Sequence, residues 1–192
     1  MGLFYGNITL HGASRQSLMS VLRRLNRTAF VSPTINGSTV AFDQEVDEQD
    51  FDRIEEFGCA LTGDLGCSGL VAALYDDDVL YLWLFQNGQA IDHYDSLPGY
   101  FDPAAEPGRP DGGDSALLCR AFARPDRENR VEQLLRGSLL QDELPEIPGE
   151  LERHQALVLE LGMPAFAAGL GYSAIADNDV PIEFRDVVFE PV

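Results

Sequence analysis

Apolar and polar residues alternate in short segments over the first part of the chain, and these segments predict a regular order of strands and helices. Residues 3–10 have the composition and length of a strand. A helix is expected to begin near Ser14, because leucines then recur at a helical spacing. The pair Asn36-Gly37 lies between two β-branched segments, which is the typical sequence of a hairpin.

A second helix and a further strand complete the first half. The helix is predicted to begin with Asp47 as its N-cap, because a side-chain oxygen there can accept from the first backbone N–H groups. Residues 69–75 follow as a strand. The order β-α-β-β-α-β resembles the ferredoxin-like arrangement, in which an antiparallel sheet carries both helices on one face. This resemblance concerns layout alone and implies no activity.

The segment 79–85, VLYLWLF, is apolar at every position. Such a strand is expected in the middle of a sheet that is covered on both sides. One face carries Tyr81 and Trp83, and the other carries three leucines. We expect the helices of the first half to cover the leucine face, and the C-terminal third of the chain to cover the aromatic face.

Polar runs flank this strand. Asp76, Asp77 and Asp78 precede it, and Asn87-Gly88 follows it. Aspartate, asparagine and glycine tolerate turn conformations, so both runs are interpreted as turns. The three aspartates lack the alternate ligand positions, the glycine and the closing glutamate of a calcium loop. No metal site is therefore predicted.

The register of the next strand decides which side chains meet. A two-residue turn after the strand places Trp83 opposite Asp92 and Tyr81 opposite Tyr94. His93 then points to the other face, so Asp92 and His93 cannot act together. Tyr81, Trp83, Asp92 and Tyr94 are our candidate residues for binding a ligand or partner. The alternative is an ordinary core in which a phenol or a backbone group satisfies Asp92.

The C-terminal third begins with a connection rich in proline and glycine and continues mainly as helix. Leucine spacing predicts three helices, over residues 114–123, 126–136 and 150–162. A terminal strand is expected over residues 182–192. We expect a sheet-centred α+β core in residues 1–102 and, in the same domain, residues 103–192 packed on it. The sheet should be mainly antiparallel, with about six strands.

The net charge of the chain limits the classes of molecule that it can bind. The net charge is −19, and the 13 basic residues are all arginine. Such a chain should be repelled by nucleic acid and by anionic membranes, whereas a basic protein would be attracted. A GC-rich genome or a salt-rich cytoplasm would also explain an acidic chain without lysine. No apolar run approaches the ~20 residues of a membrane span, and we expect a cytoplasmic protein without a secretory signal.

No recognisable motif of catalysis or cofactor binding is present. The three cysteines have no metal-ligand spacing, and His154 is expected at a helix surface or boundary. We therefore predict no catalytic residue and no cofactor, and lean against an enzyme. The leading hypothesis is a non-catalytic interaction or regulatory module, immunity- or inhibitor-like in one form, that binds a protein through an acidic and aromatic surface. The alternatives are a small-molecule binder or unrecognised enzyme that uses the Trp83–Asp92 face, and a salt-adapted protein.

Overall fold

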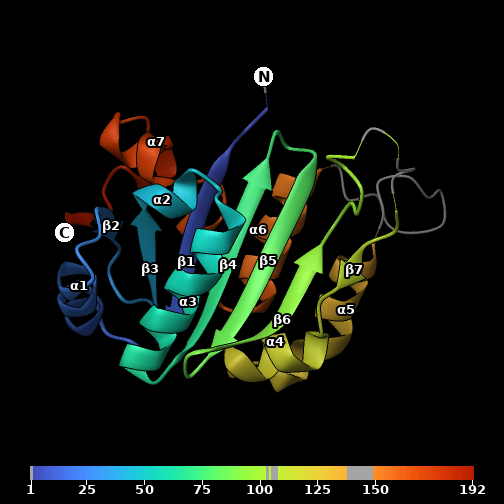
Figure 1. Ribbon diagram of the computed structural model, residues 1–192, viewed down its shortest axis with the longest axis horizontal. Coiled ribbons are helices and arrows are strands. Elements are labelled where there is room, and N and C mark those ends of the chain that lie inside the picture. The colour runs from blue at the N-terminus through green and yellow to red at the C-terminus, as the bar shows by residue number, and fades with distance from the viewer. Residues whose placement is uncertain (1, 103, 105–107, 138–148) are drawn as a thin grey trace.

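A single antiparallel sheet with helices on both faces forms the structure, a computed structural model that describes residues 2–102, 104, 108–137 and 149–192 (Figure 1). In these residues the sheet has eight strands in the order β7-β6-β5-β4-β1-β3-β2-β8. The strands are β1 Tyr5–His11, β2 Ala29–Val31, β3 Ser38–Asp43, β4 Ser68–Tyr75, β5 Val79–Gln86, β6 Gln89–Asp95, β7 Asp111–Gly112 and β8 Glu190–Pro191.

The helices divide between the two faces of the sheet. The α-helices are α1 Arg15–Arg24, α2 Gln44–Asp47, α3 Phe51–Leu65, α4 Ser115–Ala121, α5 Glu128–Arg136, α6 Glu150–Glu160 and α7 Tyr172–Ala176. Helices α1 and α3 pack on one face, and α4, α5 and α6 pack on the other (Figure 1). Among the described helices, none combines the length and the apolar character needed to cross a lipid bilayer.

The predicted number of about six strands is too low, because the sheet has eight. The strands β7 and β8 have two residues each, which is too short for any periodic pattern to reveal. The predicted terminal strand is correct only at its end. Ile182–Phe184 forms a 3₁₀ turn, and Glu190–Pro191 alone pairs with β2.

The second helix does not begin at Asp47. Asp47 is the last residue of the short helix α2, and α3 begins at Phe51 with Asp50 as its N-cap, whose side chain accepts from the backbone N–H of Arg53. The sequence VDEQD offers more than one residue that can cap a helix, so pattern alone could not choose. Gln49 separates the two helices with a positive φ of 59°.

The strand β5 is buried on both faces, as expected, but the two coverings are exchanged. Helix α3 covers the face of Tyr81, Trp83 and Phe85, and the C-terminal helices cover the leucine face. At Gly58 the helix lies so close to the ring of Phe85 that a Cβ atom would come within 2.5 Å of it. Because both faces are apolar, the sequence could not indicate which covering belongs to which face.

The C-terminal helices are held together by a buried ion pair. Arg153 of α6 is 1% exposed and contacts Glu150 at 2.8 Å, while its guanidinium also donates to the carbonyls of Leu134, Leu135 and Gly137. These carbonyls belong to the C-terminal end of α5, where backbone acceptors have no partner within the helix. The pair therefore joins α6 to α5.

His154 was expected at a helix surface or boundary, and this is wrong. The side chain is buried, and its Nδ1 lies 2.5 Å from the hydroxyl of Tyr5 on β1. Burial lowers the pKa of His154 to about 3, because a charged imidazolium would lose its hydration. The histidine is thus a neutral core residue that connects α6 to the sheet.

Candidate functional site

The turn after β5 is the predicted two-residue turn, yet the predicted register of β6 is wrong. Asn87 and Gly88 have positive φ angles of 49° and 86°, and Gln86 pairs with Gln89. The register then shifts between Leu84 and Phe85, because β6 contains one extra residue there. A bulge of one residue turns every later side chain to the opposite face of the sheet.

The bulge separates the four candidate residues. Trp83 lies opposite His93 and Tyr81 opposite Asp95, whereas Tyr94 lies opposite Leu82. Tyr81 and Trp83 therefore face α3, and Asp92 and Tyr94 lie on the other side of the sheet.

The two residues on the C-terminal side have structural partners. The hydroxyl of Tyr94 donates to the carbonyl oxygen of Leu135 at 2.9 Å. The carboxylate of Asp92 accepts from the backbone N–H of Asp114 at 2.6 Å, at the N-cap of α4. Asp92 also lines an acidic surface hollow beside α5. These contacts anchor β6 to the C-terminal helices.

The two residues on the α3 side belong to a continuous cluster of aromatic rings. The ring centroid of Phe51, at the start of α3, lies 4.9 Å from Tyr81 and 5.1 Å from Trp83. Phe101 extends the cluster, with its centroid 6.4 Å from Tyr81 and 4.9 Å from Tyr75. Tyr81 and Trp83 are each only 6% exposed, so they form the base of the cluster and not its surface.

Where α3 begins, the cluster opens to solvent around a hollow of about 320 Å³, which we call the aromatic hollow. Its lining residues are Phe4, Asp47, Glu48, Gln49, Phe51, Tyr75 and Phe101. Phe4, Phe51 and Phe101 are 47%, 37% and 53% exposed. They are three of the seven large hydrophobic side chains that are exposed in the described part of the chain, and they meet at one place. Clustered exposure of this kind is typical of a binding surface.

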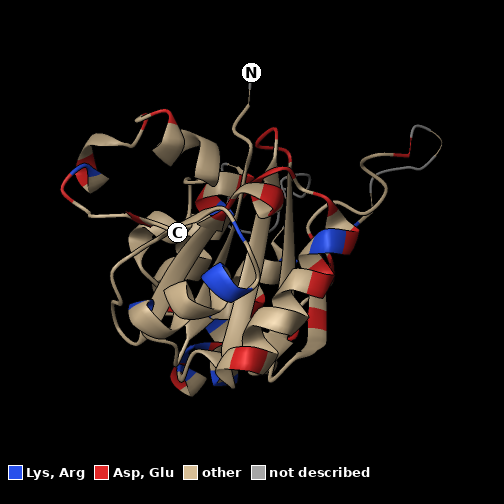
Figure 2. Cartoon of the chain, turned by 60° about the vertical axis from the view of Figure 1, so that its left-hand side comes forward, with Lys and Arg blue, Asp and Glu red and all other residues tan. Residues whose placement is uncertain are grey.

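Acidic residues surround the aromatic hollow. Residues 43–56, which include α2 and the start of α3, carry eight acids and one arginine. The turn from Asp76 to Asp78 lies at the same end of the molecule, where Figure 2 shows red acidic segments near the N-terminus. The carboxylate of Asp78 accepts from the hydroxyl of Tyr100 at 2.8 Å, and this hydrogen bond raises the pKa of Tyr100 to about 12. The field at the hollow therefore favours a cation.

Two polar side chains of the hollow are held in place by the backbone. Asp47 accepts from the backbone N–H of Gly6 and from the backbone and hydroxyl of Ser173. Gln49 donates through Nε2 to the carbonyls of Tyr5 and Leu74, at 3.1 and 2.8 Å. Its Oε1 is buried and has no hydrogen-bond partner among the described residues. These hydrogen bonds fix the wall of the hollow between α2 and the strands β1 and β4.

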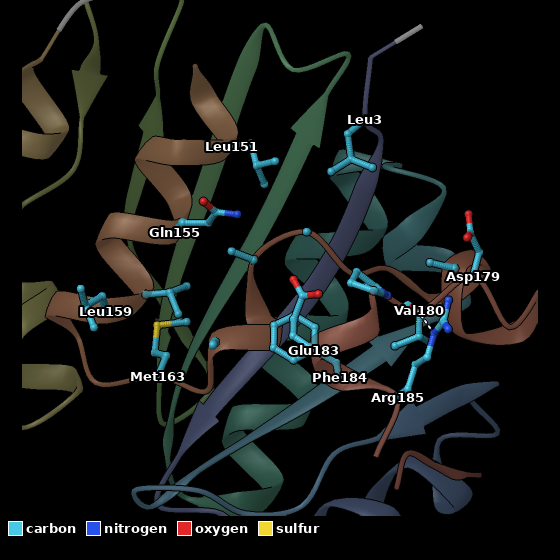
Figure 3. A pocket seen from close by; sticks show the side chains of 16 residues that line it. Leu3, Leu151, Gln155, Leu159, Met163, Asp179, Val180, Glu183, Phe184 and Arg185 are labelled. Carbon is cyan, nitrogen blue, oxygen red and sulfur yellow. Dashed lines mark hydrogen bonds between the residues drawn. The ribbon is translucent and has the colours of Figure 1, made fainter. Parts of the chain in front are cut away.

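A larger groove of about 710 Å³ lies between α6 and the C-terminal segment (Figure 3). Its walls are mainly apolar, and Leu151, Leu159 and Phe184 contribute to them. Gln155 on α6 and Glu183 and Arg185 on the C-terminal segment supply polar groups (Figure 3). None of its lining residues is a serine, a cysteine or a histidine.

The chain matches no family model, no curated protein and no solved structure. The chemistry of the candidate site therefore has to be argued from its own groups. Among the described residues, no group of three or more His, Cys, Asp or Glu side chains could hold a metal ion. Aromatic faces beside carboxylates can bind a cation, because the ring quadrupole and the negative charge both attract it.

Of the four candidate residues, Tyr81 and Trp83 lie beneath the aromatic hollow, and the exposed rings around the hollow were not among the candidates. Phe4, Phe51 and Phe101 are far apart in the chain, and only the folded sheet brings them together. One signal was available: Phe51 is an aromatic residue in the first turn of a helix start that is otherwise acidic. The fold does not bring Asp92 and Tyr94 to this site.

Proposed function

We propose that this protein is a non-catalytic interaction module that binds a basic protein through the aromatic hollow and the acidic surface around it. The observation that carries the proposal is the meeting of Phe4, Phe51 and Phe101, which are all exposed, around one hollow. Interfaces that bind proteins are enriched in aromatic anchors, and a surrounding charge of one sign selects a partner of the opposite sign.

The charge of the whole chain supports a basic partner. With a net charge of −19, the protein attracts a cationic surface at a distance, and the rings then supply contact area that does not depend on salt. Removal of apolar ring surface from water should contribute more to the affinity, and the acids should contribute more to the association rate.

The alternative of a ligand-binding or catalytic face formed by Trp83 and Asp92 is not favoured by any observation. The two side chains lie on opposite faces of the sheet. Trp83 is also almost fully buried beneath Phe51.

The proposal also includes the layout of the first half of the chain and the cellular location of the protein. The first half is proposed to follow the ferredoxin-like layout, and the antiparallel order β4-β1-β3-β2 supports this. The protein is proposed to act in the cytoplasm, and its three free cysteines support a reducing environment.

The test is a capture experiment with matched variants and purified components. Three proteins are immobilised: the wild type, a Phe51→Ala/Phe101→Ala variant and a Leu159→Ala variant. Each is exposed to an extract of the native cells, and the proteins that it retains are identified and then purified. We expect at least one basic protein to bind the wild type and the Leu159→Ala variant, and to bind the double variant at least about tenfold more weakly. Leu159 is the control because it is 74% exposed on α6, away from the hollow.

Salt separates this binding from nonspecific apolar contact. Raising the ionic strength from about 0.05 to 0.3 M should slow association severalfold, since exposed charges are screened over a Debye length of about 10 Å or less. Purified partners that bind equally well at both ionic strengths, or that bind the double variant as tightly as the wild type, would contradict the proposal.

A further inference from the structure

The partner chemistry of the aromatic hollow can be stated more closely, and this inference rests on the proposed function. We propose that the hollow receives one arginine side chain of the basic partner, with its guanidinium between the exposed phenylalanine rings and the carboxylates of Asp47 and Glu48. The volume of about 320 Å³ is large enough for one long side chain and too small for a folded segment.

The walls of the hollow suit a flat cation. Phe4 and Phe101 each meet Tyr75 edge to face, with centroid distances of 4.7 and 4.9 Å and interplanar angles of 79° and 85°. Rings in this arrangement turn their faces in different directions, so part of their face area remains available to a bound guanidinium. A guanidinium is planar and weakly hydrated, and it stacks on such faces better than an ammonium group does.

The polar groups of the hollow match the donors of a guanidinium. Asp47 and Glu48, which both line the hollow, supply two negative charges at its rim. A guanidinium has five N–H donors in a fixed plane, so it can serve more than one of these acceptors while its face lies on a ring. An ammonium group has three donors and no face.

The chain already binds one of its own arginines in this way. Arg27 donates to the carboxylates of Asp43 and Glu45, and its guanidinium carbon lies 4.4 Å from the ring centroid of Phe57. Two carboxylates and one aromatic ring thus hold a guanidinium at a site that shares α2 and α3 with the hollow. The hollow offers the same kinds of group, with more rings and no arginine among its lining residues.

The test uses short capped, fluorescently labelled peptides of alternating glycine and arginine, with lysine and citrulline versions of equal length. Binding to the full chain is measured by fluorescence anisotropy at low ionic strength. We expect the arginine peptide to bind at least about fivefold more tightly than the lysine peptide, because both have the same charge and differ in stacking. The citrulline peptide, which keeps the planar shape without the charge, should bind at least about tenfold more weakly than the arginine peptide.

Variants of the hollow locate the binding. Phe101→Leu keeps an apolar side chain but removes the ring, and it should abolish the preference for arginine over lysine. Leu159→Ala is the matched control and should leave both affinities unchanged. Equal affinities for the arginine and lysine peptides in the wild-type protein, or a preference that survives Phe101→Leu, would overturn the inference.

The outcomes separate this inference from the proposed function. If a basic partner binds in a salt-dependent way but the arginine preference is missing, the arginine site is wrong and the interaction surface stands. If the arginine preference is present but no captured partner depends on Phe51 and Phe101, the hollow binds arginine and the proposed function is wrong.

Discussion

The two faces of the sheet use their conspicuous side chains in different ways. On the C-terminal face, Tyr94, Arg153 and His154 are buried and engaged by other groups of the protein. On the α3 face, the aromatic cluster extends from the buried rings of the sheet to Phe51 and Phe101, whose rings reach solvent. Tyr94, Arg153 and His154 are thus explained by contacts within the protein, whereas the exposed rings of Phe51 and Phe101 are left free to bind another molecule.

The comparison predicts the largest loss of stability for Arg153→Ala. The substitution removes the donors to three carbonyls of α5 and leaves the buried Glu150 without its cation. The free energy of unfolding should fall by about 3–5 kcal/mol, as measured by chemical denaturation. Arg53→Ala is the control, because the Arg53 side chain is 60% exposed although it forms ion pairs. Removal of this side chain should change the free energy of unfolding by less than about 1 kcal/mol. Equal effects of the two substitutions would contradict the structural role of Arg153.

A pH-dependent loss of stability should come from His154. Its pKa is depressed to about 3 in the folded protein, whereas it is near 6.5 when exposed, so the unfolded chain binds the proton first. The contribution is fully present above pH 6.5 and declines as the pH falls towards 3, with a slope of up to about 1.4 kcal/mol per pH unit.

The measurement is the difference in unfolding free energy between wild type and His154→Gln from pH 7 to 5. Glutamine offers both a donor and an acceptor to the Tyr5 hydroxyl but does not titrate in this range. The wild type should lose stability faster on acidification. Parallel pH profiles would show that His154 is not buried in its neutral form.

A matched pair of tyrosines compares the faces directly. Tyr94→Phe removes the hydrogen bond to the Leu135 carbonyl and leaves that buried acceptor with one partner fewer, so unfolding should become easier by about 1 kcal/mol. Tyr81→Phe on the α3 face should change stability by less than about 0.5 kcal/mol, because no hydrogen bond of its hydroxyl is found in the described structure. Thermal denaturation of both variants checks the difference, and a larger effect at Tyr81 would reverse the comparison.

The smallest change in stability is expected at Phe101. Its ring is 53% exposed, so Phe101→Leu should leave the free energy of unfolding within about 0.5 kcal/mol of the wild type. The same variant should lose the arginine preference described above. A substitution that affects binding without affecting stability is the behaviour of a surface contact, and a drop of about 2 kcal/mol would instead assign the ring to the core.

Local features of this fold could be predicted because short-range chemistry determines them. Ser14 and Asp114 cap helices near the positions where leucine spacing placed them, and Asn87-Gly88 forms its turn. The bulge in β6 could not be predicted, since the sequence QAIDHYD contains no glycine or proline that would signal an extra residue. That one residue changed the face of Asp92 and Tyr94 and so divided the candidate site.

Long-range features depended on information that a single pattern does not contain. A strand that is apolar on both sides leaves open which helices cover which side, and β5 received the opposite arrangement to the one expected. The aromatic hollow depends on Phe4, Phe51 and Phe101, which share no periodicity. His154 resembled a surface residue because its partner, Tyr5, is 149 positions away in the chain.

The two ends of the sheet limit how this protein can meet another molecule. The outermost strands, β7 and β8, have two residues each, and one residue of β8 is Pro191, which has no backbone N–H. The border at β8 therefore offers little template for an incoming extended chain. At the opposite border β7 pairs only with Tyr94 and Asp95, so the start of β6 has no strand partner on that side in the described structure. Pairing of a partner's main chain with this sheet is consequently restricted to the first residues of β6.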